Sequence, residues 1–118
     1  MSTRCRGRII ERMRANAPDR AAVLEDIRAL AATPAPLLEQ VERTLADGYA
    51  CALAIEGQRL RLQRQLEERA VNLGESFGAQ ADEVAGLARG VARAGEELSE
   101  LRAALVRLAA VAQRLRSA

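Results

Sequence analysis

The feature that most constrains this chain is an unbroken apolar repeat in its C-terminal part. Apolar residues return there at alternating three- and four-residue steps, which is the a/d pattern of a helix packed along one seam. The positions of the repeat are Val84, Leu87, Val91, Ala94, Leu98, Leu101, Leu105, Leu108, Ala112 and Leu115. The pattern predicts a helix over residues 79–116. Gly86, Gly90 and Gly95 lower helix propensity, so we expect its first half to be weaker than its second unless a neighbour packs closely on it.

A second helix is predicted over residues 36–73, with Pro36 at its first position. Its a/d positions are Leu38, Val41, Leu45, Gly48, Ala52, Ile55, Leu62, Leu66 and Leu73, and Arg59 and Arg69 interrupt them. A second apolar stripe lies off this seam and consists of Tyr49, Leu53, Gly57, Leu60 and Val71. We therefore expect this helix to touch two neighbours, with Gly57 permitting a close approach.

Proline and glycine mark the boundaries between the segments. All 3 prolines lie in the first 36 residues, and Pro34 and Pro36 end a shorter predicted helix over residues 19–32. The next break covers residues 72–78, where either Ser76 caps the following helix or Gly78 gives the turn its freedom. A connection this short makes the flanking helices antiparallel neighbours.

These segments predict an all-α fold with a long antiparallel, coiled-coil-like helical hairpin and a shorter N-terminal helix. Small residues beside the C-terminal seam widen the apolar face, which favours a bundle over a bare pair of helices. We expect a three-helix bundle, or a four-helix bundle on dimerisation. Residues 19–118 form a single helical domain in this interpretation, and residues 1–18 form a basic N-terminal segment.

Composition removes most catalytic chemistry. The 118 residues include no histidine, and all 18 basic side chains are arginine, so the commonest general base and the Schiff-base amine are both missing. Without histidine, the Glu-x-x-His pairs of a di-iron bundle cannot exist. We interpret the carboxylate pairs and clusters as solvated helix faces. We therefore expect no enzymatic activity, no cofactor and no metal site.

The charge distribution leaves one alternative open. A net charge of +2 argues against a general nucleic-acid binder. Arg4, Arg6, Arg8 and Arg12 nevertheless form a basic head that could contact a phosphate backbone. A nucleic-acid-associated regulator is thus the alternative function, although such runs more often serve as solubilising tails.

The sequence shows no apolar run that suits a membrane span or a secretory signal. We interpret Cys5 and Cys51 as thiols in a reducing compartment, with a bridge between them as the less favoured reading. Cys51 beside the seam is expected to be a small core residue. A cytoplasmic location follows as an expectation.

Residues 37–68 read LLEQVERTLADGYACALAIEGQRLRLQRQLEE and resemble the leading helices of flagellar export chaperones of the FliT/FlgN type. The resemblance rests on Leu37, Leu38, Glu39, Leu45, Gly48, Ala52, Leu53, Glu56, Leu60 and Leu66. It implies a small bacterial, cytoplasmic helical bundle that holds the helical end of an export substrate.

The leading hypothesis is a non-enzymatic helical protein–protein interaction module that offers a groove of leucine and alanine to another helix, from itself or from a partner. Chaperone or adaptor work in secretion is one version, and a self-associating coiled-coil protein is another, so we expect a homo-oligomer. We predict Leu98, Leu101, Leu105 and Leu108 as the central packing residues. The sequence leaves open whether this packing is within one chain or between chains.

Overall fold

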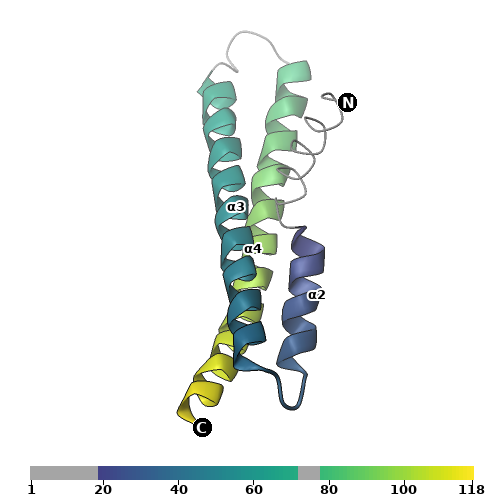
Figure 1. Ribbon diagram of the computed structural model, residues 1–118. Coiled ribbons are helices and arrows are strands. Elements are labelled where there is room, and N and C mark those ends of the chain that lie inside the picture. Colours follow the sequence, from purple (N-terminus) through teal and green to yellow (C-terminus); the bar gives the residue numbers. More distant parts are fainter. Residues whose placement is uncertain (1–18, 72–77) are drawn as a thin grey trace, which may run out of the picture. The chain divides into compact units, whose positions relative to one another are not determined.

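The computed structural model describes residues 19–71 and 78–118. They form three helices, α2 (Arg20–Ala31), α3 (Leu38–Val71) and α4 (Ala79–Ser117), and no strand occurs in these ranges (Figure 1). The predicted all-α class is confirmed. The bounds of α2 and α4 agree with the predicted ranges to about one residue, within the usual uncertainty of helix ends.

Local hydrogen bonds explain where α2 begins and ends. The Asp19 carboxylate accepts from the backbone N–H of Ala21 at 3.2 Å, so Asp19 is the N-cap. Leu24, Ile27 and Leu30 recur at three-residue steps and are all buried. The N–H of Ala32 then donates to the carbonyl of Arg28, and the N–H of Thr33 donates to the carbonyl of Leu30, both at 3.1 Å, which closes the last turn before the prolines. The helix therefore buries one narrow face.

The start of α3 differs slightly from the prediction. The first helical hydrogen bond runs from the N–H of Val41 to the carbonyl of Leu37 at 3.0 Å. Leu37 is therefore the N-cap, and the helix begins at Leu38, two residues after Pro36. The Leu37 carbonyl is the first that accepts an intrahelical hydrogen bond. Pro36 therefore precedes the helix and is not its first residue, although its fixed φ would suit that position.

A glycine begins α4. The N–H of Asp82 donates to the carbonyl of Gly78 at 3.1 Å, and Gly78 has a φ of +107°. A side chain would strain this conformation, which explains why glycine stands here. Of the two starts that the sequence left open, the structure has the one at Gly78, whereas Ser76 lies outside the described residues.

The chain divides into two compact units, and α3 and α4 each contribute to both. The first unit contains the residues up to Cys51 together with Ala103–Ala118 and includes α2, so we call it the three-helix unit. The second contains Ala52–Arg102, which comprises parts of α3 and α4 only, and we call it the two-helix unit.

The core of the three-helix unit is centred on Gly48. A Cβ atom on Gly48 would collide with Cδ2 of Leu105 on α4 and would lie 3.0 Å from Cδ1 of Ile27 on α2. The missing side chain thus allows α3 to contact both of its neighbours closely. The sequence predicted two neighbours for α3, but this contact is made by Gly48 and not by the second apolar stripe. The buried side chains of this unit are Leu24, Ile27, Leu30, Val41, Leu45, Cys51, Ala104, Leu105, Leu108, Val111 and Ala112.

Arg116 of α4 forms an ion pair with Glu42 of α3 in the same unit. Its guanidinium donates to Oε1 of Glu42 through Nη2 at 3.1 Å and through Nε at 3.3 Å. Both side chains are about half exposed, so the pair orients the helix ends more than it stabilises them.

The two-helix unit is less well buried. Its buried residues are Ile55, Ala94, Leu98 and Leu101. Ion pairs join Glu56 of α3 to Arg102 of α4 at 3.5 Å, and Arg69 of α3 to Glu83 of α4 at 3.3 Å. The later residue of α3 thus pairs with the earlier residue of α4. No described residue in 59–71 or 78–93 is buried. Two helices share only one interface, and the side chains of that interface keep contact with solvent at its edges.

We predict that Gly48→Ala lowers the free energy of unfolding by about 1–3 kcal/mol, because the added methyl overpacks against Leu105. Leu105 is only 2% exposed and has little room to move aside. Gly57→Ala is the matched control on the same helix, where the nearest atom to the new methyl is Nη1 of Arg61 at 3.7 Å.

The control should raise the free energy of unfolding by up to about 1 kcal/mol through helix propensity. Urea denaturation followed by circular dichroism measures both. Equal effects of the two substitutions would contradict the close contact at Gly48.

Candidate functional site

The four leucines predicted as central packing residues are all core residues of this chain. Leu98, Leu101, Leu105 and Leu108 are 2%, 0%, 2% and 0% exposed. Their packing is internal, and none of them presents its side chain to solvent. A surface that receives a partner must therefore be made of other residues.

Other predicted residues fall inside and outside the described ranges. Cys51 is 1% exposed, which confirms it as a small core residue. Cys5 and the basic head of Arg4, Arg6, Arg8 and Arg12 lie outside the described residues, so their predicted roles stay predictions.

The described ranges contain no set of acidic and cysteine side chains grouped closely enough to bind a metal ion. Several of the predicted acidic clusters lie on exposed helix faces, as Glu67, Glu68, Asp82 and Glu96 show. None of the three described helices has a segment that is both long and apolar enough to cross a membrane.

The apolar stripe predicted on α3 is exposed. Leu53 is 71% exposed, Tyr49 is 54% and Leu60 is 50%. Val71 at the end of the helix is 84% exposed. Isolated surface leucines are ordinary, but a stripe of them at helical spacing on one helix is a candidate contact surface.

A second accessible apolar surface is the seam of the two-helix unit. Its members are neither buried nor fully exposed, and we call them the half-buried seam: Leu62, Leu66, Val84, Leu87 and Val91. Gly90 faces Leu62 here, and a Cβ atom on it would make an ordinary van der Waals contact with Cδ1 of Leu62 at 3.4 Å. In the three-helix unit the corresponding α3 and α4 positions, such as Val41, Leu45 and Leu108, are buried, because α2 adds a third apolar face. The half-buried seam thus consists of core-type residues whose side chains remain partly accessible to solvent.

The heptad repeat did not distinguish these seam residues from the buried ones, because apolar residues return at the same spacing in the two-helix unit and in the three-helix unit. The available signals were the interruptions by Arg59 and Arg69 and the glycines of α4. Each of these removes apolar contact from the seam.

Arg59 places a polar group within this seam. Its guanidinium faces Gly95 of α4, and a Cβ atom on Gly95 would lie 3.8 Å from Cζ of Arg59, an ordinary van der Waals contact. The Nε of Arg59 is buried and has no hydrogen-bond partner among the described residues. An unpaired buried donor is unfavourable.

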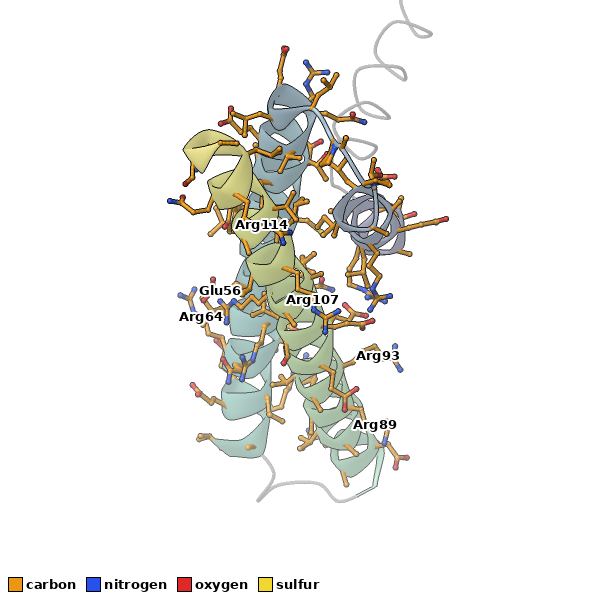
Figure 2. The ribbon with its side chains drawn as sticks, turned by 90° about the horizontal axis from the view of Figure 1, so that it is seen from below. Glu56, Arg64, Arg89, Arg93, Arg107 and Arg114 are labelled. Atoms are coloured by element: carbon orange, nitrogen blue, oxygen red, sulfur yellow. The ribbon has the colours of Figure 1, made fainter. Side chains whose placement is uncertain are left out.

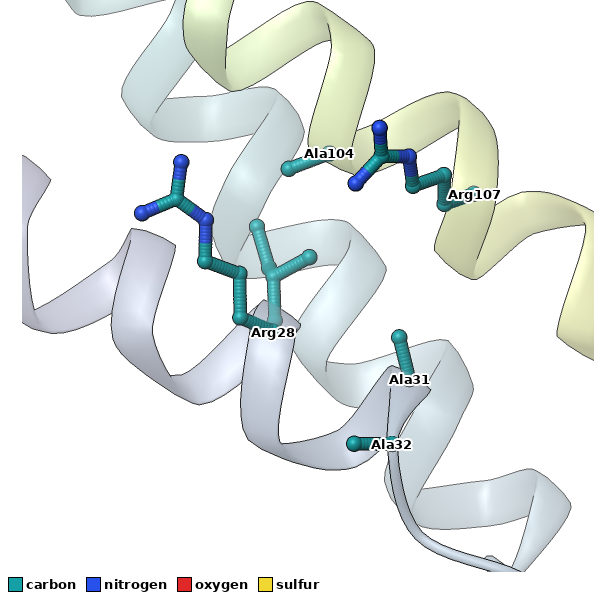
Figure 3. A pocket seen from close by; sticks show the side chains of 6 residues that line it. Arg28, Ala31, Ala32, Ala104 and Arg107 are labelled. Carbon is teal, nitrogen blue, oxygen red and sulfur yellow. The ribbon is translucent and has the colours of Figure 1, made fainter.

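A shallow hollow of about 300 Å³ lies between α2 and α4 in the three-helix unit. Figure 3 shows the side chains of Arg28 and Arg107 bordering it, with Ala104 between them and with Ala31 and Ala32 of α2 to one side. Its alanine surface is small and its border is cationic. A short apolar group beside a carboxylate would fit this chemistry, but no buried polar group lines the hollow to orient a ligand.

Figure 2 labels further arginines, Arg64 on α3 and Arg89, Arg93 and Arg114 on α4. All four are exposed. They are distributed along both helices, and they therefore do not form a focused binding site for an anion.

No family model matches the chain, and comparison with the curated proteins and with the solved structures found no match. The resemblance of residues 37–68 to flagellar export chaperones therefore stays a prediction.

Leu108→Ala should lower the free energy of unfolding by about 2–5 kcal/mol, because it leaves a cavity at a fully buried position. Val106→Ala on the same helix removes a side chain that is 70% exposed and should change it by less than about 0.5 kcal/mol. Urea denaturation compares the two. A Leu108→Ala variant as stable as Val106→Ala would show that the seam is not internal.

Arg59→Met should raise the free energy of unfolding by about 1 kcal/mol, because it replaces an unpaired buried N–H with an apolar side chain of similar length. Arg61→Met, at an exposed position of the same helix, is the control and should have almost no effect. A loss of stability in Arg59→Met would mean that the arginine has a hydrogen-bond acceptor outside the described residues.

Proposed function

We propose that this chain is a non-enzymatic protein–protein interaction module that binds a helix from another polypeptide. In this proposal α3 and α4 run antiparallel, α2 completes a three-helix bundle in the three-helix unit, and the partner helix completes one in the two-helix unit. A chaperone or adaptor in secretion is a concrete version, supported by the resemblance of residues 37–68 to export chaperones.

The observation that carries the proposal is the difference in burial between the two units. In the three-helix unit most seam positions of α3 and α4 are buried, whereas in the two-helix unit burial is confined to Ile55, Ala94, Leu98 and Leu101, and the half-buried seam remains accessible. Covering apolar surface stabilises a complex by about 25 cal/mol per Å², so a third helix that lies on this seam gains free energy as α2 does in its own unit.

The chemistry of the seam also defines the partner. Leucine and valine at seam positions favour a helix with apolar anchors at i, i+3, i+4 and i+7. The positive charge of Arg59, at a partly exposed position beside this seam, favours a helix that carries a carboxylate beside those anchors. The bound helix would therefore be amphipathic, with an acidic residue at one edge of its apolar face.

Photo-crosslinking tests this proposal. A photoreactive amino acid at Leu87, in the half-buried seam, should form an adduct with a helix of another protein, whereas the same amino acid at exposed Gln113 should not. The crosslinked segment is then synthesised and titrated against the purified chain. Leu87→Glu should weaken its binding about tenfold or more, because it puts a charge into the covered seam.

Two outcomes contradict the proposal. An adduct only with residues 1–18 of the same chain would mean that the seam is covered internally. A partner segment that binds Leu87→Glu as tightly as the unmodified chain would mean that it binds elsewhere.

A further inference from the structure

The part of α4 in the two-helix unit carries three glycines close together, Gly86, Gly90 and Gly95. Glycine in a helix interior is less favourable than alanine, because it loses more backbone entropy on folding and adds no side chain to the packing. The sequence therefore predicts a weak first half of α4 unless a neighbour packs closely on these positions. The contacts of the three glycines decide whether a neighbour does so.

Neither Gly86 nor Gly90 is needed for a close contact among the described residues. A Cβ atom on Gly86 would have Nη2 of Arg89 as its nearest neighbour, at 3.8 Å, and this is the flexible end of an exposed side chain. A Cβ atom on Gly90 would lie 3.4 Å from Cδ1 of Leu62, which is an ordinary contact. Alanine would thus fit at both positions without displacing a described neighbour.

Gly95 gives the same result, since a Cβ atom on it would lie 3.8 Å from Cζ of Arg59. Gly48 in the three-helix unit is different, because a Cβ atom there would collide with Cδ2 of Leu105. Packing therefore explains the glycine of the three-helix unit, whereas the described contacts explain none of these three glycines of α4. What the three do contribute is a lower stability of the helix itself.

Burial and ion pairs do not offset this weakness. No described residue in 59–71 or 78–93 is buried. The side chains of the ion pair between Arg69 and Glu83 are 52% and 44% exposed, and such pairs add little to stability. In the three-helix unit, α4 instead buries Leu105 and Leu108 almost completely. The two parts of the same helix therefore differ both in helix propensity and in burial.

We propose that residues 59–71 of α3 and 79–93 of α4 form an opening element, which unfolds locally and refolds while the three-helix unit stays folded. Opening exposes Leu62, Leu66 and Leu87 fully, so the half-buried seam alternates between a partly covered and a fully exposed form. The glycines of α4 set how often the element opens, because they lower the stability of the closed, helical form. This opening is a property of the free chain and does not require the partner helix proposed above.

Native-state proteolysis with trypsin tests the proposal. The chain has no lysine, so trypsin cleaves it only after arginine. Arg93 lies in the opening element and Arg107 lies in the three-helix unit, and both are exposed on α4 (Figure 2). Cleavage within a helix requires the surrounding residues to unfold, so the rate at each site reports the population of the form that is open there.

Initial rates in the full-length chain are measured by mass spectrometry, and each is divided by the rate at the same site in an unfolded synthetic peptide. Cleavage after Arg93 should then be about tenfold or more faster than cleavage after Arg107, because it needs only the local opening. Low concentrations of urea should hardly change the rate at Arg93. They should raise the rate at Arg107, because global unfolding exposes far more surface than local opening does.

Substitutions between glycine and alanine identify the cause of the opening. Gly86→Ala should slow cleavage after Arg93 about fourfold, because alanine favours the helix and meets no close neighbour. Ala88→Gly, at an exposed position of the same stretch, should accelerate this cleavage by a similar factor. Ala110→Gly, at an exposed position of the three-helix unit, is the matched control. It should accelerate cleavage after Arg107 and leave cleavage after Arg93 unchanged.

Equal normalised rates at Arg93 and Arg107, with the same dependence on urea, would overturn the proposal, because the chain would then unfold as one cooperative unit. An unchanged rate at Arg93 in Gly86→Ala would also overturn it, because the glycine would not set the opening. The crosslink from Leu87 requires a partner, whereas the cleavage pattern requires only the purified chain. Failure of the opening element and failure of the partner-helix proposal therefore give different results.

Discussion

The close contact at Gly48 is the constraint on which the three-helix unit depends. A leucine from α4 and an isoleucine from α2 meet at the backbone of α3, in a space that any side chain would fill. Because the chain has only one tyrosine and one phenylalanine, its core cannot use large rings to span wide gaps between helices. Leucine, valine and alanine fill the core well only when the helices lie close, and glycine at this position permits that.

Burial in the rest of the molecule follows from the number of helices that meet. An α-helix with a wide apolar stripe needs more than one neighbour to cover it. Among the described helices, the stripe on α4 has two neighbours in the three-helix unit and one in the two-helix unit, although its residue types change little along its length. The same kind of side chain is therefore a core residue at Leu108 and a half-accessible one at Leu87.

Much of the fold could be predicted from the sequence, because helices depend on local spacing and on proline and glycine signals. The repeat identified Leu101 and Leu108 as packing residues, and Gly78 was one of the two predicted ways to begin α4. The exposure of the second α3 stripe could not be predicted in this way. Spacing shows that residues share a face of a helix, but it does not show whether another helix reaches that face, and Leu53 fits a buried or an exposed stripe equally well.

The uneven burial has a consequence for local unfolding of the chain. We expect backbone amides in the well-packed stretch around Leu101–Leu108 to exchange with solvent only through large-scale unfolding, and those of the less buried residues 59–71 to exchange through local opening. The half-buried seam lies in that less buried part. Under the proposed function, a helix that binds there would also order the region it binds, which lowers its affinity. The proposed site would therefore favour reversible binding over permanent assembly.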